Sequence, residues 1–299
     1  MSAFPARAAT YYVTVSGLGG EPDYEQRFTA LAGDLDKSFR NSGNEAHVYT
    51  LTGGQATRDH LAETLGLVAG QAKPADDFVL VLIGHGSFDG AEYKFNLVGP
   101  DITGSDLAAL CDRIASKRQL IVNTTSASGG SIAAMEKPGR AVIAATKSGT
   151  EKNATVFARF WSEALQDPTT DTDKNDAISA LEAFQYAVNK TNDFYDSQKR
   201  LATEHAVFED TGKNEPVRAP ATETGEGLLL STFTLIRLGS GRAIASDPAK
   251  RELLGKKEDL EQKIDALKYG KAAMSEEDYK QQLTQALVEL AKVQQELDK

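Results

Sequence analysis

Three clusters of small and polar residues in this sequence could form a catalytic rim. Residues 84 to 86 read Gly-His-Gly, residues 123 to 130 read NTTSASGG, and residues 145 to 153 read ATKSGTEKN. An imidazole can act as a general base near neutral pH, and a hydroxyl becomes a nucleophile when a base takes its proton. His85 and Ser126 are therefore the candidate base and nucleophile. Gly129 and Gly130 leave the following turn open, so that its backbone N–H groups could hold an oxyanion.

Each cluster follows a run of residues that is typical of a buried strand. Residues 78 to 83 are continuously apolar, and QLIVNT at 119 to 124 and RAVIAAT at 140 to 146 have the same character. Such runs indicate strands that are covered on both faces of a parallel sheet. The carboxyl ends of parallel strands meet at one edge, where ligands bind. If the first two of these strands are neighbours, His85 and Ser126 face each other.

Strand and helix patterns alternate along most of the chain, which predicts an α/β fold with a three-layer α/β/α, mostly parallel sheet. Further strands are expected at 10–16, 46–51 and 225–238, helices at 24–39, 56–71, 104–116, 155–166 and 180–196, and a polar loop at 211–225. Residues 10–246 are expected to form one domain. Residues 247–299 carry leucines at helical spacing, with a break at 268–279 in which Ser275 can cap a second helix. This pattern predicts a C-terminal antiparallel helical hairpin.

The stretch from residue 10 to about residue 165 resembles the caspase-hemoglobinase fold (clan CD), and most closely the legumain-type (asparaginyl endopeptidase-like) cysteine peptidases. The resemblance rests on VSGLGGEPDYEQRF, on an apolar strand that runs into Gly-His-Gly, and on a further strand that runs into a small-residue motif ending in Ser-Gly. It implies a caspase-like sheet with His85 as the base. Ser128 and Gly129 match the Ser-Gly pair, so the nucleophile position falls on Ser126, where the family has cysteine.

The same resemblance implies which residues line the cleft. Gly86, Ser128 and Gly129 would lie beside the oxyanion, while Thr146, Ser148 and Gly149 would flank an extended peptide or protein substrate. Glu25 or Arg27 could read a substrate side chain, although both also fit the solvated face of an amphipathic helix.

Serine at the nucleophile position changes the expected activity. A thiol with a pKa near about 8.5 ionises with modest help, whereas a serine hydroxyl needs a base that is itself supported. Asp89 could support His85, but an Asp in Ser-Phe-Asp-Gly is more typical of a turn. We expect a weak or inactive peptidase. The alternatives are a true serine hydrolase, a non-catalytic peptide- or protein-binding pseudoenzyme, and a cysteine-to-serine trapped variant of an active cysteine endopeptidase.

Residues 171–182, DTDKNDAISALE, match the template of an EF-hand calcium loop. The expected ligands are Asp171, Asp173, Asn175, the Ala177 carbonyl, Ser179 and Glu182, at positions 1, 3, 5, 7, 9 and 12. Asp176 stands at position 6, where glycine usually takes a left-handed turn that Asp also tolerates. The alternative is an acidic helix N-cap, and the complete set of offsets favours Ca²⁺. No organic cofactor is expected.

The composition limits the remaining function classes. The formal net charge is −10, which argues against a nucleic-acid partner because such binding needs a basic face. No apolar run is long enough to span a membrane, and the single cysteine, Cys111, reads as a small buried apolar residue. The composition is that of a soluble protein. Residues 6–8, Ala-Arg-Ala, resemble the end of a signal-peptide cleavage site. An extracytoplasmic location would follow only if a signal peptide had been trimmed. The hairpin could associate with a partner.

Overall fold

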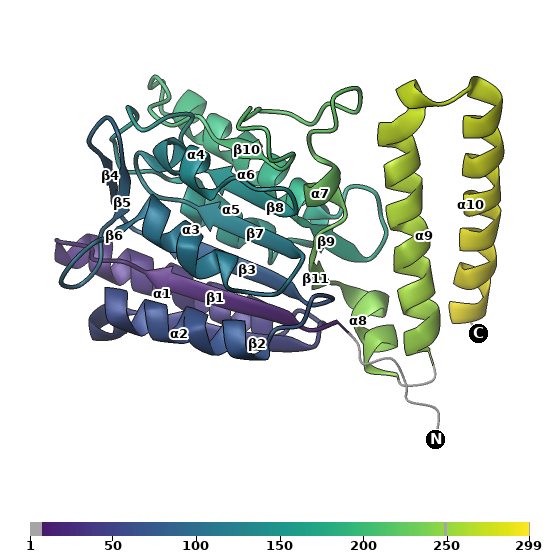
Figure 1. The fold of residues 1–299 in the computed structure, drawn as a ribbon, viewed down its shortest axis with the longest axis horizontal. Helices are drawn as coiled ribbons and strands as arrows, with labels where there is room; N and C mark the ends of the chain where they lie inside the picture. The colour runs from purple at the N-terminus through teal and green to yellow at the C-terminus, as the bar shows by residue number, and fades with distance from the viewer. Residues whose placement is uncertain (1–7, 248–249, 299) are drawn as a thin grey trace.

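A six-stranded sheet forms the centre of the protein (Figure 1), as seen in a computed structural model that describes residues 8–247 and 250–298. The strand order is β10-β8-β7-β3-β1-β2, and every pair is parallel except β10 with β8. The strands are β1 (Thr10–Ser16), β2 (Ala46–Leu51), β3 (Asp77–Ile83), β7 (Arg118–Asn123), β8 (Arg140–Ala144) and β10 (Val207–Glu209). The predicted α/β class with a mostly parallel sheet is confirmed.

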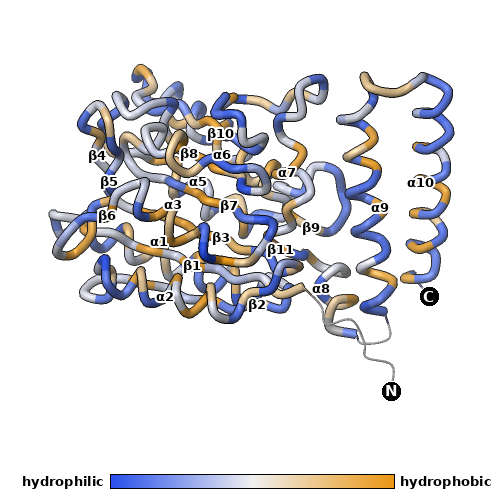
Figure 2. The backbone as a smooth tube through the Cα atoms, in the orientation of Figure 1, coloured by the Kyte–Doolittle hydropathy of each residue, from blue (hydrophilic) through white to orange (hydrophobic). Residues whose placement is uncertain are grey.

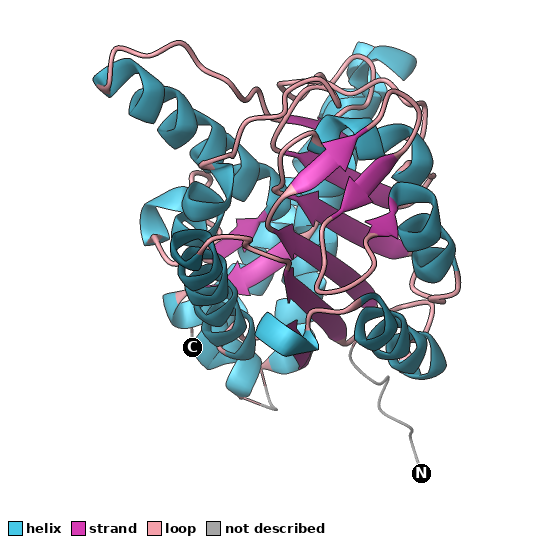
Figure 3. Ribbon diagram, turned by 90° about the vertical axis from the view of Figure 1, so that its left-hand side faces the viewer, coloured by secondary structure: helices cyan, strands magenta, loops and turns pink. Residues whose placement is uncertain are grey.

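Helices cover both faces of this sheet (Figure 3). Residues Val79, Val81 and Ile83 of β3 pack in the same apolar cluster as residues of α1 (Pro22–Arg40), α5 (Phe157–Ala164) and α6 (Ala180–Ser197). Leu80 and Leu82 pack in a second cluster with residues of α2 (Arg58–Gln71) and α3 (Gly104–Asp112). All five side chains are at most 1% exposed. Burial on both faces of the sheet explains why the run in β3 is continuously apolar. Figure 2 shows orange, hydrophobic segments among the central strands.

The helices begin and end where the sequence provides start and stop signals. In α1, Pro22 occupies the first turn, acidic Asp23 and Glu25 lie near the amino end, and basic Lys37 and Arg40 lie near the carboxyl end. This arrangement suits the helix dipole. The helices of the domain are α1 (Pro22–Arg40), α2 (Arg58–Gln71), α3 (Gly104–Asp112), α4 (Ile132–Met135), α5 (Phe157–Ala164), α6 (Ala180–Ser197), α7 (Leu228–Ser231) and α8 (Gly239–Ser246), with 3-10 turns η1 (Gly53–Gln55), η2 (Ser128–Ser131) and η3 (Pro168–Thr170).

A small antiparallel sheet that the sequence analysis missed lies beyond the end of β3. It consists of β4 (Gly86–Phe88), β5 (Tyr93–Phe95) and β6 (Ile102–Thr103). The Phe88 ring occupies the space in which Gly130 and Gly149 would carry a Cβ, at 2.6 Å and 2.3 Å from the nearest ring atoms. These two glycines therefore allow β4 to pack onto the turns that follow β7 and β8.

The strand predicted at 225–238 is only partly correct, because its first half is helical. The buried carboxylate of Asp210 accepts the N–H groups of Gly227, Leu229 and Leu230 and so caps the single turn α7. The strand β11 (Thr234–Arg237) follows, and it pairs with the short strand β9 (Ala177–Ser179) outside the main sheet. The apolar pattern of residues 225–238 could not reveal this helix turn, because the carboxylate that caps it comes from Asp210.

Two long helices, α9 (Arg251–Gly270) and α10 (Glu276–Leu297), form the predicted C-terminal pair, joined through η4 (Lys271–Ala273). Ser275 caps α10 by accepting the Asp278 N–H. Leucine and valine side chains close the seam between the two helices. The domain boundary at residue 247 stays a prediction, and Pro248, Ala249 and Lys299 lie outside the described residues, as do Ala6 and Arg7.

None of the helices in the described ranges is long and apolar enough to cross a membrane. Cys111 is buried in α3, and burial raises the pKa of its thiol to about 12. It therefore behaves as an apolar core residue and not as a nucleophile.

Candidate functional site

The strands that precede His85 and Ser126 are neighbours in the sheet. β3 and β7 pair in parallel, with Leu82 opposite Asn123, so their carboxyl ends meet at one edge. His85 follows β3 and Ser126 follows β7 by a few residues each. The structure therefore brings the two predicted residues to the same rim of the sheet.

The hydroxyl of Ser126 contacts the residue next to His85 and not the imidazole itself. Ser126 Oγ accepts the N–H of Gly86 at 3.2 Å and donates to the carbonyl oxygen of Gly86 at 3.1 Å. The Ser126 residue is only 4% exposed. A Cβ at Gly86 would lie 2.6 Å from the carbonyl oxygen of Ser126 and from Thr125 Oγ1. Only glycine fits at this crossing, which explains one glycine of the Gly-His-Gly motif.

His85 lies half-buried against the first turns of α1. Its ring meets the rings of Tyr24 and Phe28 edge-on, with centroids 4.7 Å and 5.1 Å apart. Burial lowers the pKa of the imidazole below its usual 6.5, and a backbone hydrogen bond with Gly19 and the charge of Glu21 oppose that shift. The imidazole is therefore mostly neutral near pH 7, the form in which it can accept a proton.

The turn after Ser126 has a strained backbone. Ala127 is buried and adopts φ 55°, a left-handed conformation that side chains other than glycine rarely take. The Ala127 N–H donates to the Glu151 carbonyl at 2.8 Å, and the Gly130 N–H donates back to the Ala127 carbonyl at 2.9 Å. Backbone strain that is held in place in this way is typical of functional sites, and here it lies next to the predicted nucleophile Ser126.

The amides expected to hold an oxyanion are already used within the protein. The Gly129 N–H donates to Thr146 Oγ1 at 2.9 Å, and the Gly130 N–H is bonded within its own turn. The expectation that these two amides are open is therefore wrong, because the turn folds on itself. The Gly86 N–H is the amide that faces the Ser126 hydroxyl.

The residues expected to flank a peptide divide into buried and accessible ones. Thr146 is fully buried, and its hydroxyl also donates to the Ser148 carbonyl at 3.1 Å and contacts the buried Ser128. Gly149 packs under Phe88, so Ser148 is the partly exposed member of the predicted set. Thr146 therefore acts as a connector between the turns that follow β7 and β8.

The residues with alternative roles are also placed by the structure. Asp89 lies in a turn, where its exposed carboxylate accepts the N–H groups of Ala91 and Glu92, and these bonds lower its pKa. Arg27 is exposed and lies over the Tyr24 ring. Glu25 is half-buried and accepts the Gly19 N–H. The turn contact of Asp89 agrees with the interpretation that the sequence favours, whereas the sequence pattern does not specify the contacts of Arg27 and Glu25.

A histidine that the sequence analysis did not consider lies near the same turn. His205 Nδ1 is 2.5 Å from Glu151 Oε1, and the second oxygen of Glu151 accepts the N–H groups of Lys147 and His205. This pair fixes the loop after β8 from the side of β10. No local motif surrounds His205, so only the three-dimensional arrangement reveals it.

Three of the predicted calcium ligands gather in the loop 171–182. One carboxylate oxygen from each of Asp171, Asp173 and Glu182 lies within 4.8 Å of the others. Asp176 adopts φ 67°, the left-handed conformation that position 6 requires. Burial and the charge of Glu182 raise the pKa of Asp173 to about 6, as expected for carboxylates that repel one another.

The remaining predicted ligands take part in local hydrogen bonds. The Asn175 side-chain oxygen accepts the Ala177 N–H at 2.9 Å. Ser179 caps α6 in a full capping box in which Glu182 accepts the Ser179 N–H. The acidic N-cap that was weighed against calcium is therefore present, and it uses the same glutamate.

The acidic loop and the candidate rim lie at opposite ends of the sheet (Figure 1). The loop pairs through β9 with β11, and the Arg237 N–H of β11 donates at 2.7 Å to the carbonyl of Ser42, which precedes β2. α9 contacts this end, because Lys257 Nζ donates to the Asn175 carbonyl at 3.0 Å and Arg237 pairs with Glu258. A cation in the loop would therefore act on the hairpin's end of the protein and not on His85.

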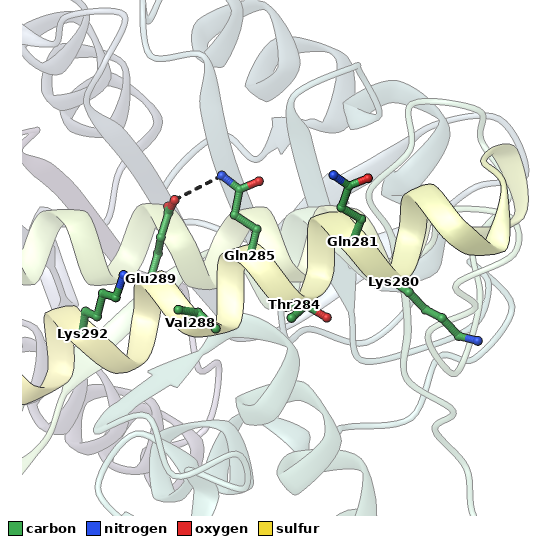
Figure 4. Close-up of a pocket in the computed structure, with 7 residues that line it drawn as sticks. All are labelled: Lys280, Gln281, Thr284, Gln285, Val288, Glu289 and Lys292. Carbon is green, nitrogen blue, oxygen red and sulfur yellow. Dashed lines mark hydrogen bonds between the residues drawn. The ribbon is translucent and has the colours of Figure 1, made fainter.

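The helix α10 lies far from this rim (Figure 1), and its surface carries a shallow depression (Figure 4). It is lined by Lys280, Gln281, Thr284, Gln285, Val288, Glu289 and Lys292. Val288 is its only aliphatic member and no buried polar group points into it. Its chemistry is that of an ordinary solvated helix face.

No protein-family model matches the chain, and no curated protein matches it in sequence. Among solved structures it is similar to the Drosophila initiator caspase Dronc, with 13% identity and a TM-score of 0.47, over 70% of this chain and 81% of that one. It is also similar to a protein from Geobacter sulfurreducens, with 11% identity and a TM-score of 0.46, over 78% of this chain and 100% of that one. Both TM-scores lie below 0.5, and neither likeness assigns an activity to this chain.

Proposed function

We propose that the rim formed by β3 and β7 is a peptidase-type site, with His85 at the base position and Ser126 at the nucleophile position. The observation that supports this most strongly is the contact between the Ser126 hydroxyl and the Gly86 backbone, at 3.2 Å and 3.1 Å, one residue from His85. The Gly86 N–H lies within hydrogen-bonding distance of Ser126 Oγ, so it could donate to the carbonyl oxygen on which negative charge develops when residue 126 attacks the carbonyl carbon. The ligand that fits such a rim is an extended peptide or an exposed protein segment.

We further propose that the protein is weak or inactive as a peptidase and acts mainly by binding. The Ser126 hydroxyl donates its proton to a carbonyl, which is far too weak a base to activate it. The rings of Tyr24 and Phe28 flank His85, and no carboxylate among the described residues is hydrogen-bonded to its imidazole. A histidine supported in this way suits a thiol, which ionises easily, better than a hydroxyl.

The test uses the full-length protein and a library of peptides that carry a thiol-reactive electrophile, with varied side chains beside it. Ser126→Cys should be labelled at residue 126, the parent should not, and Ser126→Cys/His85→Ala should react at least about 100-fold more slowly. Cys111 is buried and stays unlabelled. Labelling of the parent at Ser126 would show a true serine hydrolase, and no labelling of Ser126→Cys would overturn the peptidase-type assignment.

We also propose that the loop 171–182 binds Ca²⁺. Three carboxylates within 4.8 Å repel one another, and a divalent cation would relieve that repulsion. Asp171, Asp173 and Glu182 would supply carboxylate oxygens, and Asn175, Ala177 and Ser179 are the other expected contributors. The cation would neutralise the carboxylate charges of the loop that contacts α9, and it would take no part in chemistry at His85.

Calcium binding predicts a change in stability. At about 100 times its Kd a ligand that binds only the folded state adds about 2.7 kcal/mol, which corresponds to a rise in Tm of about 4 °C for a chain of this size. Glu182→Gln should abolish the difference between calcium and chelator, while the exposed Glu252→Gln should keep it. An identical Tm for the parent in calcium and in chelator would contradict the proposal.

A further inference from the structure

We propose that Glu151 is a positioning residue for residue 126, which acts through the backbone of Ala127. The carbonyl oxygen of Glu151 accepts the Ala127 N–H at 2.8 Å, and Ala127 directly follows Ser126. The side chain of Glu151 is held in turn by donors from Lys147 and His205. The inference deepens the proposed peptidase-type site and rests on it, and it concerns how this chain keeps residue 126 in place.

Three hydrogen-bond donors surround the Glu151 carboxylate. Its Oε2 accepts the N–H of Lys147 at 3.0 Å and the N–H of His205 at 3.1 Å. Its Oε1 lies 2.5 Å from Nδ1 of His205, and since a carboxylate only accepts, this ring nitrogen carries a proton and donates. Only 12% of the Glu151 side chain is exposed. Hydrogen bonds to an ionised acceptor are stronger than neutral ones, so this cluster holds the carboxylate firmly.

The segment that carries His205 is fixed on both sides. On one side, β10 pairs with β8, with Val207 opposite Ala144. On the other side, the buried carboxylate of Glu204 accepts the N–H groups that open α5, at 2.8 Å and 3.2 Å. His205 therefore presents its donors at a fixed place beside the end of β8.

The Glu151 carboxylate joins the loop after β8 to this fixed segment. Lys147 and Glu151 are the two ends of a short turn that contains Gly149, and the carboxylate closes that turn by accepting the Lys147 N–H. Without the carboxylate, the Glu151 N–H would keep its long bond of 3.4 Å to the Ser148 carbonyl. The position of the Glu151 carbonyl, and with it the bond to Ala127, thus depends on the side chain of the same residue.

Ala127 needs this support because its backbone is strained. It is buried with φ 55°, a left-handed conformation that is unfavourable for a residue with a Cβ. Its N–H is held by the Glu151 carbonyl and its own carbonyl accepts the Gly130 N–H at 2.9 Å. If the Glu151 carbonyl moves away, Ala127 can relax and rotate the chain at residue 126. The contacts of Ser126 Oγ with the Gly86 backbone, at 3.2 Å and 3.1 Å, would then be lost.

The first test measures amide hydrogen exchange of Ala127 by nuclear magnetic resonance in the ¹⁵N-alanine-labelled full-length protein, with the signal assigned from Ala127→Gly. Glu151→Ala should speed this exchange at least about tenfold. Glu151→Gln should stay within about threefold of the parent, because its amide oxygen can accept both N–H groups and its NH₂ group can donate to His205 Nδ1. Asn153→Ala, two residues later and exposed, is the matched control and should exchange like the parent.

Equal exchange of Ala127 in the parent and in Glu151→Ala would overturn the inference. A milder variant covers the case in which Glu151→Ala does not fold. His205→Ala removes the ring donor and leaves both backbone N–H groups, and it should speed the exchange of Ala127 at least about threefold. An unchanged rate in that variant would equally contradict the proposal.

A second readout separates positioning from a general structural role. In the Ser126→Cys background, Glu151→Ala should slow labelling by the electrophilic peptide at least about tenfold and shift the midpoint of its pH profile upward, because a thiol that leaves Gly86 also leaves His85. Glu151→Gln should restore both. Slower labelling with an unshifted pH profile would indicate a structural role and contradict the proposal. If no Ser126→Cys protein is labelled, the peptidase-type site fails, and the exchange of Ala127 still decides whether Glu151 positions residue 126.

Discussion

Thr146→Val should destabilise the protein because the Thr146 hydroxyl connects the turns that follow β7 and β8. Thr146 Oγ1 accepts the Gly129 N–H at 2.9 Å and donates to the Ser148 carbonyl at 3.1 Å, and the residue is fully buried. Valine has nearly the same shape, but it leaves the Gly129 N–H without its acceptor and removes one of the two donors of the Ser148 carbonyl, which also accepts the Glu151 N–H. A buried polar group left unsatisfied costs about 1 to 3 kcal/mol, so we expect a loss of about 1 to 3 kcal/mol in the free energy of unfolding.

Urea denaturation followed by circular dichroism measures this loss, and the m-value should stay the same because the exposed area on unfolding does not change. Thr150→Val is the matched control. Thr150 is exposed, its hydroxyl contacts the Ser148 hydroxyl, and its own N–H donates to the same Ser148 oxygen, so its substitution should change the free energy by less than about 0.5 kcal/mol. If the two variants lost equal stability, the connecting role of Thr146 would be refuted.

Three further predictions concern packing, protonation and the hairpin. Gly129→Ala should cost at least about 1 to 3 kcal/mol in urea denaturation because its Cβ would lie 2.3 Å from the Ser148 nitrogen, whereas Gly66→Ala, with open space in α2, should be neutral or stabilising. Since the pKa of His85 is lowered on folding, the unfolded state binds more protons below pH 6.5, so the parent should lose stability on acidification to about pH 5 more steeply than His85→Gln. Arg237→Ala should increase hydrogen exchange in α9, because Arg237 pairs with Glu258 at 2.5 Å; equal exchange in both proteins would show that this pair does not hold the helix.

The sequence predicts the parts of this fold that depend on local periodicity. The apolar runs of β3 and β7 identify buried parallel strands, and their neighbouring positions put His85 and Ser126 on one edge. The strand predicted at 225–238 is partly wrong because its first half is capped by Asp210, a contact over 17 to 20 residues. Such a contact leaves no periodic signal in the segment that it changes.

The candidate site was predictable in its residue types and not in its hydrogen bonds. Gly-His-Gly and the Ser-rich turn indicate where the chemistry would lie, but the amides of Gly129 and Gly130 are taken by partners that the sequence does not place beside them. Glu25 was ambiguous because an acidic residue in the first turn of a helix has several ordinary uses. Its contact with the Gly19 N–H depends on how the β1–α1 loop folds back onto the first turn of α1.

The central claim is that His85 acts on whatever group residue 126 carries. The most direct measurement is the absorbance titration of the thiolate in Ser126→Cys and in Ser126→Cys/His85→Ala, with buried Cys111 as a silent background. We predict that the thiol at residue 126 ionises at a lower pH when His85 is present than when His85 is replaced by alanine. The same titration curve in both proteins would contradict the claim.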